Sequence, residues 1–126
     1  MSGYEITYPL TTPSYTFVGK KPAAVLFGDE RVEVKTWRQV YAVIIGRCNE
    51  NPQHHEMLMY MRNKAAGKVR MFLSDKLDSM TSPLRIDDDL YGETHYGSAT
   101  LMYILINQIL AYTDFDFSGI SVVLKG

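Results

Sequence analysis

The strongest hydrophobic pattern in the chain lies over residues 98–113. Apolar side chains recur there at the spacing of one helical face: Leu101, Met102, Leu105, Ile109 and Tyr112. Three more widen that face until the helix is apolar nearly all round: Ile104, Ile106 and Leu110. A helix of this kind is either central in its domain or covers a contact with a second copy. We expect Ser98 to cap its first turn.

Two earlier segments also predict helices. Residues 36–49 carry apolar positions at helical spacing, and Thr36 with Gln39 forms the pattern of a capping box at the start. The next helix begins at Asn51, a capping residue that is followed by proline. It is expected to end near Gly67, because glycine readily adopts the left-handed conformation that terminates helices.

Five segments show the alternation or the short apolar runs of β-strands: residues 24–27, 32–35, 68–74, 90–96 and 120–125. Residues 28–31 join the first two strands and include a glycine, which indicates a hairpin. Residues 75–89 are polar and interrupted by Pro83, so they are expected to form a loop or a short turn of helix.

The order ββ-α-α-β-β-α-β predicts an α+β fold of two layers, with helices on one face of a mainly antiparallel sheet. The chain divides into an extended N-terminal arm, residues 1–18, and a single α+β domain, residues 19–126. Apolar residues alternate along the arm from Tyr4 to Tyr8, and Pro9 restricts such a strand to a sheet edge. Two pairings are open for it, one with the chain's own sheet and one with a second copy.

Composition narrows the classes of function. Apolar residues make up 46% and charged residues 21% of the chain, the balance of a globular protein. The net charge of −1 disfavours binding of nucleic acid mainly through phosphates. The single cysteine, Cys48, excludes a disulfide within the chain and a thiolate zinc cluster. The opening residues show no secretory pattern, and the longest apolar stretch is about half of the ~20 residues that span a bilayer, so we expect a cytoplasmic protein without membrane contact.

Four stretches together carry a resemblance: GKKPAAVLFGDERVEVKTWRQV, KVRMFLSD, LYGETHYGSATLMYILINQIL and ISVVLK. They resemble a small bacterial domain of unassigned activity that occurs in phage-related or restriction-related proteins. In that group the strand before the last helix runs into a Ser-Ala dipeptide, as at Ser98-Ala99 here. The resemblance covers residues 19–125 and implies a fold and a phage- or restriction-related setting. It carries over no catalytic residue.

An acidic run is the best candidate for a metal or acid–base site: Asp87, Asp88 and Asp89, with Glu93 and His95 nearby. Glu93 and His95 are two residues apart on a predicted strand and therefore share a face. Calcium and magnesium need several oxygens that converge on one point, which consecutive residues do not supply by themselves. A solvated acidic turn is therefore favoured, and no metal ligand, cofactor or catalytic residue is assigned.

A basic set is the candidate for a nucleic-acid-binding face: Arg62, Lys64, Lys68 and Arg70. These residues span the end of the second predicted helix and the third predicted strand. Tyr60 is an aromatic residue close enough in sequence to stack on a base. Because the whole chain is almost neutral, an ordinary solvated face is the competing interpretation.

The sequence therefore favours a non-enzymatic binding or accessory module of unassigned function that recognises protein or nucleic acid. A homodimer is expected, since the last helix, the tyrosine-rich arm and the methionine-rich second helix expose more apolar surface than a small domain easily hides. The alternative is a metal-dependent or hydrolytic enzyme that uses the acidic cluster near residues 87–89. Convergence of those side chains in one hollow would distinguish the two classes.

Overall fold

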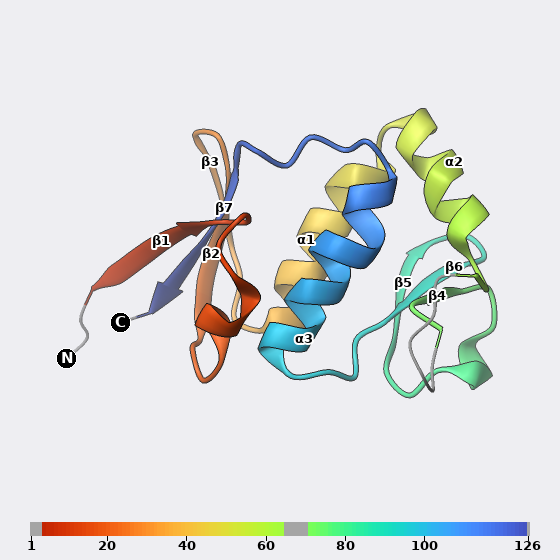
Figure 1. Cartoon of the computed structure of the whole chain (residues 1–126), viewed down its shortest axis with the longest axis horizontal. Coiled ribbons are helices and arrows are strands. Elements are labelled where there is room, and N and C mark those ends of the chain that lie inside the picture. Colours follow the sequence, from red (N-terminus) through yellow and green to blue (C-terminus); the bar gives the residue numbers. More distant parts are fainter. Residues whose placement is uncertain (1–3, 65–70, 126) are drawn as a thin grey trace.

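A computed structural model describes residues 4–64 and 71–125 and shows two antiparallel sheets with helices between them (Figure 1). The first sheet has the order β1 (Glu5–Pro9), β7 (Ile120–Lys125), β2 (Pro22–Phe27) and β3 (Glu30–Glu33). The second has the order β4 (Leu73–Ser74), β6 (Leu90–Glu93) and β5 (Pro83–Asp87). The α+β class with mainly antiparallel strands is confirmed, although the strands form two sheets rather than one. Residues 68–70 of the predicted third strand lie outside the described residues.

The described residues form three α-helices: α1 (Trp37–Asn49), α2 (Pro52–Met61) and α3 (Ser98–Tyr103). The last continues as a π-helical segment, η3 (Ile104–Ile109), and a 3-10 turn, η4 (Leu110–Tyr112). Two further 3-10 turns are η1 (Ser14–Phe17) and η2 (Leu77–Ser79). The end predicted for the second helix, Gly67, lies outside the described residues, and α2 ends before it. In the described part of the chain, no helix is both long enough and apolar enough to cross a membrane.

The starts of α1 and α2 follow the predicted capping. Thr36 Oγ1 accepts the backbone N–H of Gln39 at 3.1 Å. Gln39 Oε1 in turn accepts the backbone N–H of Lys35 at 2.6 Å, one residue further back than in a regular capping box. Asn51 Oδ1 accepts the N–H of Gln53 at 2.9 Å at the start of α2. Local hydrogen bonding therefore determines where these two helices begin.

The start of the last helix differs from the prediction. Gly97 occupies the capping position of α3, and no side chain caps the helix there. Ser98 Oγ instead donates to the carbonyl oxygen of Phe17 at 2.9 Å. The Ser98 hydroxyl thus bonds to η1, which packs beside α3. A contact between residues distant in sequence replaces the local cap. Further along, the N–H of Leu110 reaches the carbonyl of Leu105, five residues back, which defines the wide π-helical turn.

The N-terminal strand belongs to the chain's own sheet. β1 pairs with β7 in an antiparallel register from Glu5 opposite Lys125 to Pro9 opposite Ser121. Of the two pairings open for the arm, the structure thus shows the one within the chain. β1 remains an edge strand, because its other side has no partner strand among the described residues (Figure 1).

The polar stretch predicted as a loop contains a strand, so this prediction is wrong over residues 83–87, which form β5. Pro83 opens the strand, and β5 lies at the edge of the second sheet, where a missing N–H is tolerated. Asp88 and Asp89 form the two-residue turn between β5 and β6, and Asp89 adopts a positive φ of 56°. Pro83 is therefore compatible with a strand at this position.

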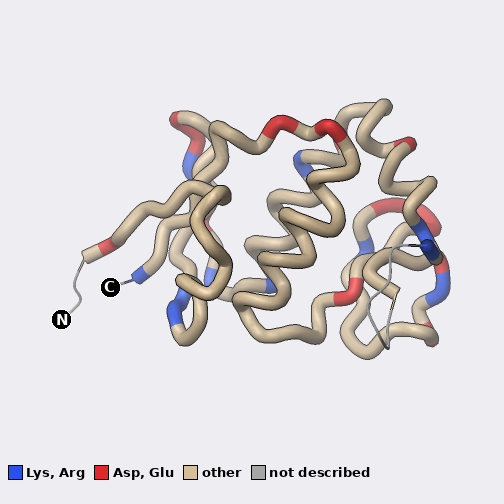
Figure 2. Tube along the Cα trace, in the orientation of Figure 1, with Lys and Arg blue, Asp and Glu red and all other residues tan. Residues whose placement is uncertain are grey.

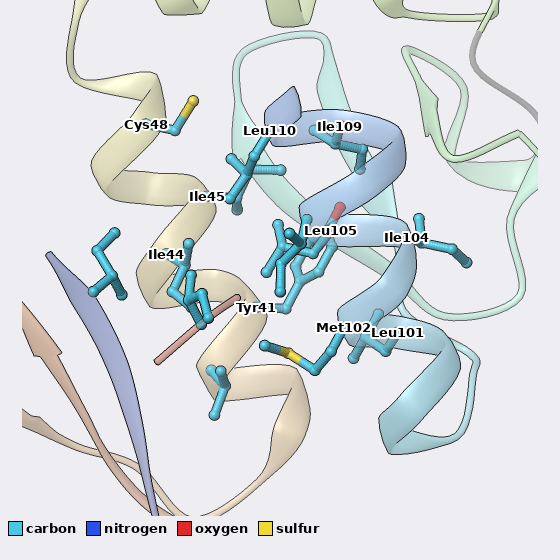
Figure 3. Packing of buried hydrophobic residues seen from close by; sticks show 14 of the residues in the cluster. Tyr41, Ile44, Ile45, Cys48, Leu101, Met102, Ile104, Leu105, Ile109 and Leu110 are labelled. Atoms are coloured by element: carbon cyan, nitrogen blue, oxygen red, sulfur yellow. The ribbon is translucent and has the colours of Figure 1, made fainter. Parts of the chain in front are cut away.

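The last helix is central in the molecule. Figure 3 shows one row of side chains from α1 facing a row from the last helix: Tyr41, Ile44, Ile45 and Cys48 opposite Leu101, Met102, Leu105, Ile109 and Leu110. The same buried cluster reaches both sheets, through Val25 and Val122 in the first and Leu90 in the second. Of the two roles that the apolar pattern left open, the helix has the central one. The apolar side chains of the last helix are buried within one copy. The last helix therefore no longer supports the predicted homodimer.

Tyr41 connects α1 to the second sheet. Its side chain is fully buried, and its hydroxyl has no hydrogen-bond partner among the described residues. Burial raises the pKa of Tyr41, with further contributions from Tyr96 and Glu93. The hydroxyl is directly against Gly92 of β6, where an added Cβ would overlap it and would lie only 2.9 Å from ring carbon Cζ. Only glycine fits at this crossing.

Replacing Gly92 with alanine should therefore destabilise the fold by about 2–3 kcal/mol through overpacking. The matched control is Gly46→Ala, because a Cβ at Gly46 meets nothing within 4 Å. It should gain up to about 1 kcal/mol from the higher helix propensity of alanine. Urea unfolding of the two variants measures both changes.

A second variant locates the cause. Tyr41→Phe removes the overlapping hydroxyl and should partly rescue Gly92→Ala. Alone it should cost little, because that hydroxyl makes no hydrogen bond with another described residue. Equal stability of Gly92→Ala and Gly46→Ala would show that the two side chains do not meet as described.

Candidate functional site

The predicted acidic cluster is dispersed in the structure. Asp87 accepts a hydrogen bond from Asn49 Nδ2 at 2.9 Å, and Asp88 forms an ion pair with Arg85. Over the described ranges, 4–64 and 71–125, no group of three or more histidine, cysteine, aspartate or glutamate side chains is placed to hold a metal ion. The convergence that the enzyme hypothesis requires is not found among these residues.

Glu93 has a structural position. It is 1% exposed, and its carboxylate accepts four backbone N–H groups. Thr81 donates to Oε1 at 2.7 Å, and Ser82 donates to Oε2 at 2.8 Å. Thr94 and His95 each donate to Oε2 at 3.1 Å. Since buried amides need acceptors, this carboxylate ties the loop before β5 to the segment after β6.

Asp87 meets a histidine that the acidic prediction did not include. His55 Nδ1 lies 2.7 Å from Asn49 Oδ1 and 3.4 Å from Asp87 Oδ2. The hydrogen bond from Asn49, followed by that from the N–H of Asp88, lowers the pKa of the Asp87 carboxyl. This cluster joins α1, α2 and β5 at a partly exposed position, where it fastens the second sheet to the helices.

Two residues of the predicted nucleic-acid face bond to the chain itself. Arg62 Nη1 donates to the carbonyl oxygen of Asp89 at 2.9 Å. Lys64 Nζ donates to the carbonyl oxygen of Tyr60 at 3.0 Å and lies 4.1 Å from the centre of its ring. The other two members of the set lie outside the described residues: Lys68 and Arg70. The nucleic-acid face thus stays a prediction.

An uncharged groove lies beside the last helix. Two adjoining hollows of about 460 and 250 Å³ share Ser14, Tyr15 and Tyr103, and we call them together the tyrosine groove. The larger hollow is also lined by Leu10, Thr11, Thr12, Pro13, Ile106, Asn107 and Phe117, and the smaller one by Ala99 and Thr100.

The fold explains how the groove arises. The turn η1 packs beside α3, fastened by the bond from Ser98 to Phe17, and it presents Tyr15. Tyr15 is 76% exposed and Tyr103 is 47% exposed, so both rings stand at the surface. Leu10 and Ile106 are buried and supply an apolar floor between them.

The chemistry of the groove is distinctive because it contains no acidic, basic or histidine side chain. Figure 2 shows that the last helix, which forms one side of the groove, carries no charged residue. Asn107 lies in the larger hollow, and its side chain forms no hydrogen bond with another described residue. Its amide can both donate to and accept from a ligand. The groove therefore suits an uncharged ligand held by aromatic and apolar contacts.

Sequence reasoning missed this site, although a signal was present. The two longest stretches without a charged residue are 6–19 and 94–113, and these segments form most of the groove. Their meeting depends on the packing of η1 against α3, which the strand and helix patterns do not specify.

Comparisons with known proteins add no assignment. No family model matches the chain, and none of the curated proteins or solved structures compared with it matches either. Function must therefore be inferred from the groove itself.

The bond from Asn49 to Asp87 can be tested by titration. A depressed folded-state pKa stabilises the fold above the unfolded value of about 3.9, and this contribution is lost as the pH falls through the folded value. Asn49→Ala removes the main cause, so the pKa of the Asp87 carboxyl should rise, as measured by carbon NMR of its side chain. The pKa of Asp116, which the N–H of Ser118 lowers, is an internal control and should not move. An unchanged pKa of Asp87 in Asn49→Ala would show that the hydrogen bond from Asn49 does not lower it.

Proposed function

We propose that the protein is a non-enzymatic binding module that recognises a protein partner through the tyrosine groove. The partner supplies an uncharged segment with apolar or aromatic side chains. One observation carries this proposal: Tyr15 and Tyr103 stand exposed on either side of a buried apolar floor, with no ionisable acid, base or histidine among the lining residues. Tyrosine is enriched at protein interfaces because its ring packs while its hydroxyl remains in water.

The charge of the groove supports a protein ligand over the other classes. Nucleic acid binds largely through its phosphates, and these need lysine or arginine, which the groove lacks. General acid–base or metal-dependent chemistry needs carboxylates, histidine or thiolate, and these are also missing from the lining residues. A peptide segment needs neither kind of group.

Asn107 gives the groove a means of selection. It lies in the larger hollow together with Tyr103 and Ile106. A side-chain amide that bonds to a peptide backbone would orient the bound segment, whereas the aromatic walls supply contact area. A π-helical turn at this position is in keeping with binding, since such turns are frequent at functional sites.

The setting expected from the sequence belongs to the same proposal. The protein acts in the cytoplasm, in a phage-related or restriction-related process. The buried free thiol of Cys48 fits a reducing compartment. The process itself rests on the resemblance alone.

Peptide display tests the groove. A library of random peptides is selected on the whole chain, and the enriched peptides should be uncharged and carry aromatic or large apolar residues. Affinity for such a peptide should fall at least about tenfold in the Tyr15→Ala/Tyr103→Ala variant, as expected for interface anchors. Tyr60→Ala is the matched control, because Tyr60 is an exposed tyrosine outside the groove. The affinity of this variant for the peptide should be unchanged. Peptides that bind all three proteins equally would contradict the proposal.

A further inference from the structure

The outer edge of β1 carries a second, independent surface. The N–H of Leu10 donates to the carbonyl of Ile120 at 3.2 Å, so this opposed pair is a hydrogen-bonded one. Hydrogen-bonded and non-hydrogen-bonded pairs alternate along an antiparallel ladder. Tyr8 and Ile6 therefore direct their backbone groups toward β7. Glu5, Thr7 and Pro9 direct theirs outward, away from the sheet.

The pairing of β7 with β2, on its opposite side, leads to the same alternation of backbone directions. The N–H of Gly28 donates to the carbonyl of Gly119 at 3.1 Å, so odd-numbered positions of β7 face β2. The even-numbered positions are left to face β1, as the bond to Ile120 requires. Two separate hydrogen bonds thus agree on which backbone groups of β1 point outward.

Two residues on this edge have both an N–H and a C=O group available for pairing with another strand. Pro9 has no N–H, and its carbonyl already accepts the N–H of Thr12 at 3.0 Å. Glu5 and Thr7 have outward N–H and C=O groups that form no backbone hydrogen bond with another described residue. An open edge with free groups at strand spacing is a template for another strand.

The side chains on one face of the edge are apolar. Ile6 is 39% exposed, Tyr4 is 66% exposed, and with Tyr8 they line a hollow of about 370 Å³. On the other face, the Glu5 carboxylate is bound by Arg31, with distances of 3.1 and 3.2 Å to the guanidinium nitrogens. The one acidic residue of the strand is therefore neutralised within the chain and does not repel a second copy.

We propose that β1 of a second copy of this chain occupies the edge, as an antiparallel pair about a two-fold axis. The register follows from the free groups. A register that places Glu5 opposite Thr7 of the partner subunit uses all of the free N–H and C=O groups and forms four hydrogen bonds. Thr7 opposite itself would place Glu5 opposite Pro9, which cannot donate. Glu5 opposite itself would place Thr7 opposite a residue outside β1.

The side chains complement each other in this register. Ile6 lies on the two-fold axis opposite Ile6 of the partner subunit, and Tyr4 lies opposite Tyr8 of the partner subunit. Cross-strand aromatic and β-branched pairs are the stabilising units of sheets. The two four-stranded sheets become one continuous sheet, and the exposed Tyr4 and Ile6 gain apolar neighbours.

Three lysines around the hollow suggest another occupant. Lys20, Lys21 and Lys125 line it with the tyrosines, and an anionic chain would suit their charge. The free N–H and C=O groups at Glu5 and Thr7 favour a polypeptide strand instead, and the self-complementary register favours a second copy. The residues that line the tyrosine groove take no part, so this proposal stands apart from the proposed function.

Proline substitution at the outward position tests the pairing. Thr7→Pro removes one outward N–H but no bond to β7, and edge strands tolerate proline with this orientation. Thr7→Ala is the matched control, because it removes the same side chain and keeps the N–H. Sedimentation over a range of concentrations should show the wild type and Thr7→Ala as dimers at high concentration and Thr7→Pro as a monomer. Circular dichroism should show the same fold in all three.

Cysteine crosslinking tests the register. Directly opposed residues of a non-hydrogen-bonded pair have Cα atoms about 4.5 Å apart, within disulfide range. Ile6→Cys should therefore form a disulfide-linked dimer under mild oxidation. Thr7→Cys should not, since it faces Glu5 of the partner subunit and not itself. The native Cys48 is buried and does not compete.

Three results would overturn the proposal. One is a wild-type chain that remains monomeric at every concentration. Another is a dimer that persists in Thr7→Pro and crosslinks no better through Ile6→Cys than through Thr7→Cys, because the second copy would then bind elsewhere. The third is a monomer that binds single-stranded DNA and loses this binding in Lys20→Ala/Lys21→Ala, which would assign the hollow to an anionic chain.

Discussion

The structure depends on one constraint: a helix that is apolar on nearly every side must be covered over most of its surface by a small chain. Each fully buried large apolar side chain contributes about 1.5–3 kcal/mol, so the buried row that includes Leu101, Leu105 and Ile109 supplies a large share of the free energy that favours folding. One sheet covers only one face of a helix pair. The strands divide into two sheets on opposite sides of α1 and the last helix, and this satisfies the constraint within one copy (Figure 1).

The candidate groove is a consequence of the same packing. Near the start of the last helix the cover is η1, a single turn that buries Phe17 and leaves Tyr15 outside. An uncharged helix beside an uncharged turn leaves a hollow with apolar walls and no ionic groups. The feature that stabilises the fold thereby creates a surface that is suited to an uncharged partner segment.

The predicted caps at Thr36 and Asn51 depend on local chemistry and are confirmed, whereas the predicted cap at Ser98 and the shared face of Glu93 and His95 are not found. The cap at Thr36 and the fold class followed from sequence pattern alone. The pairing of Glu93 with His95 assumed a strand through residue 96, but β6 ends at Glu93, so the alternation of faces stops there. The Glu93 carboxylate then accepts the N–H of His95 itself. Ser98 likewise bonds across the chain to Phe17, a partner that no local pattern identifies.

The central claim is that the last helix is covered by its own chain. Amide hydrogen exchange at low and high protein concentration tests it most directly, because exchange reports the opening of each segment. We predict that residues 101–110 exchange among the slowest in the molecule already at the low concentration, where the protein is monomeric. Slow exchange that appears only at high concentration would show that a second copy covers the helix. Fast exchange at both concentrations would show that the helix is not covered, and either result would contradict this claim.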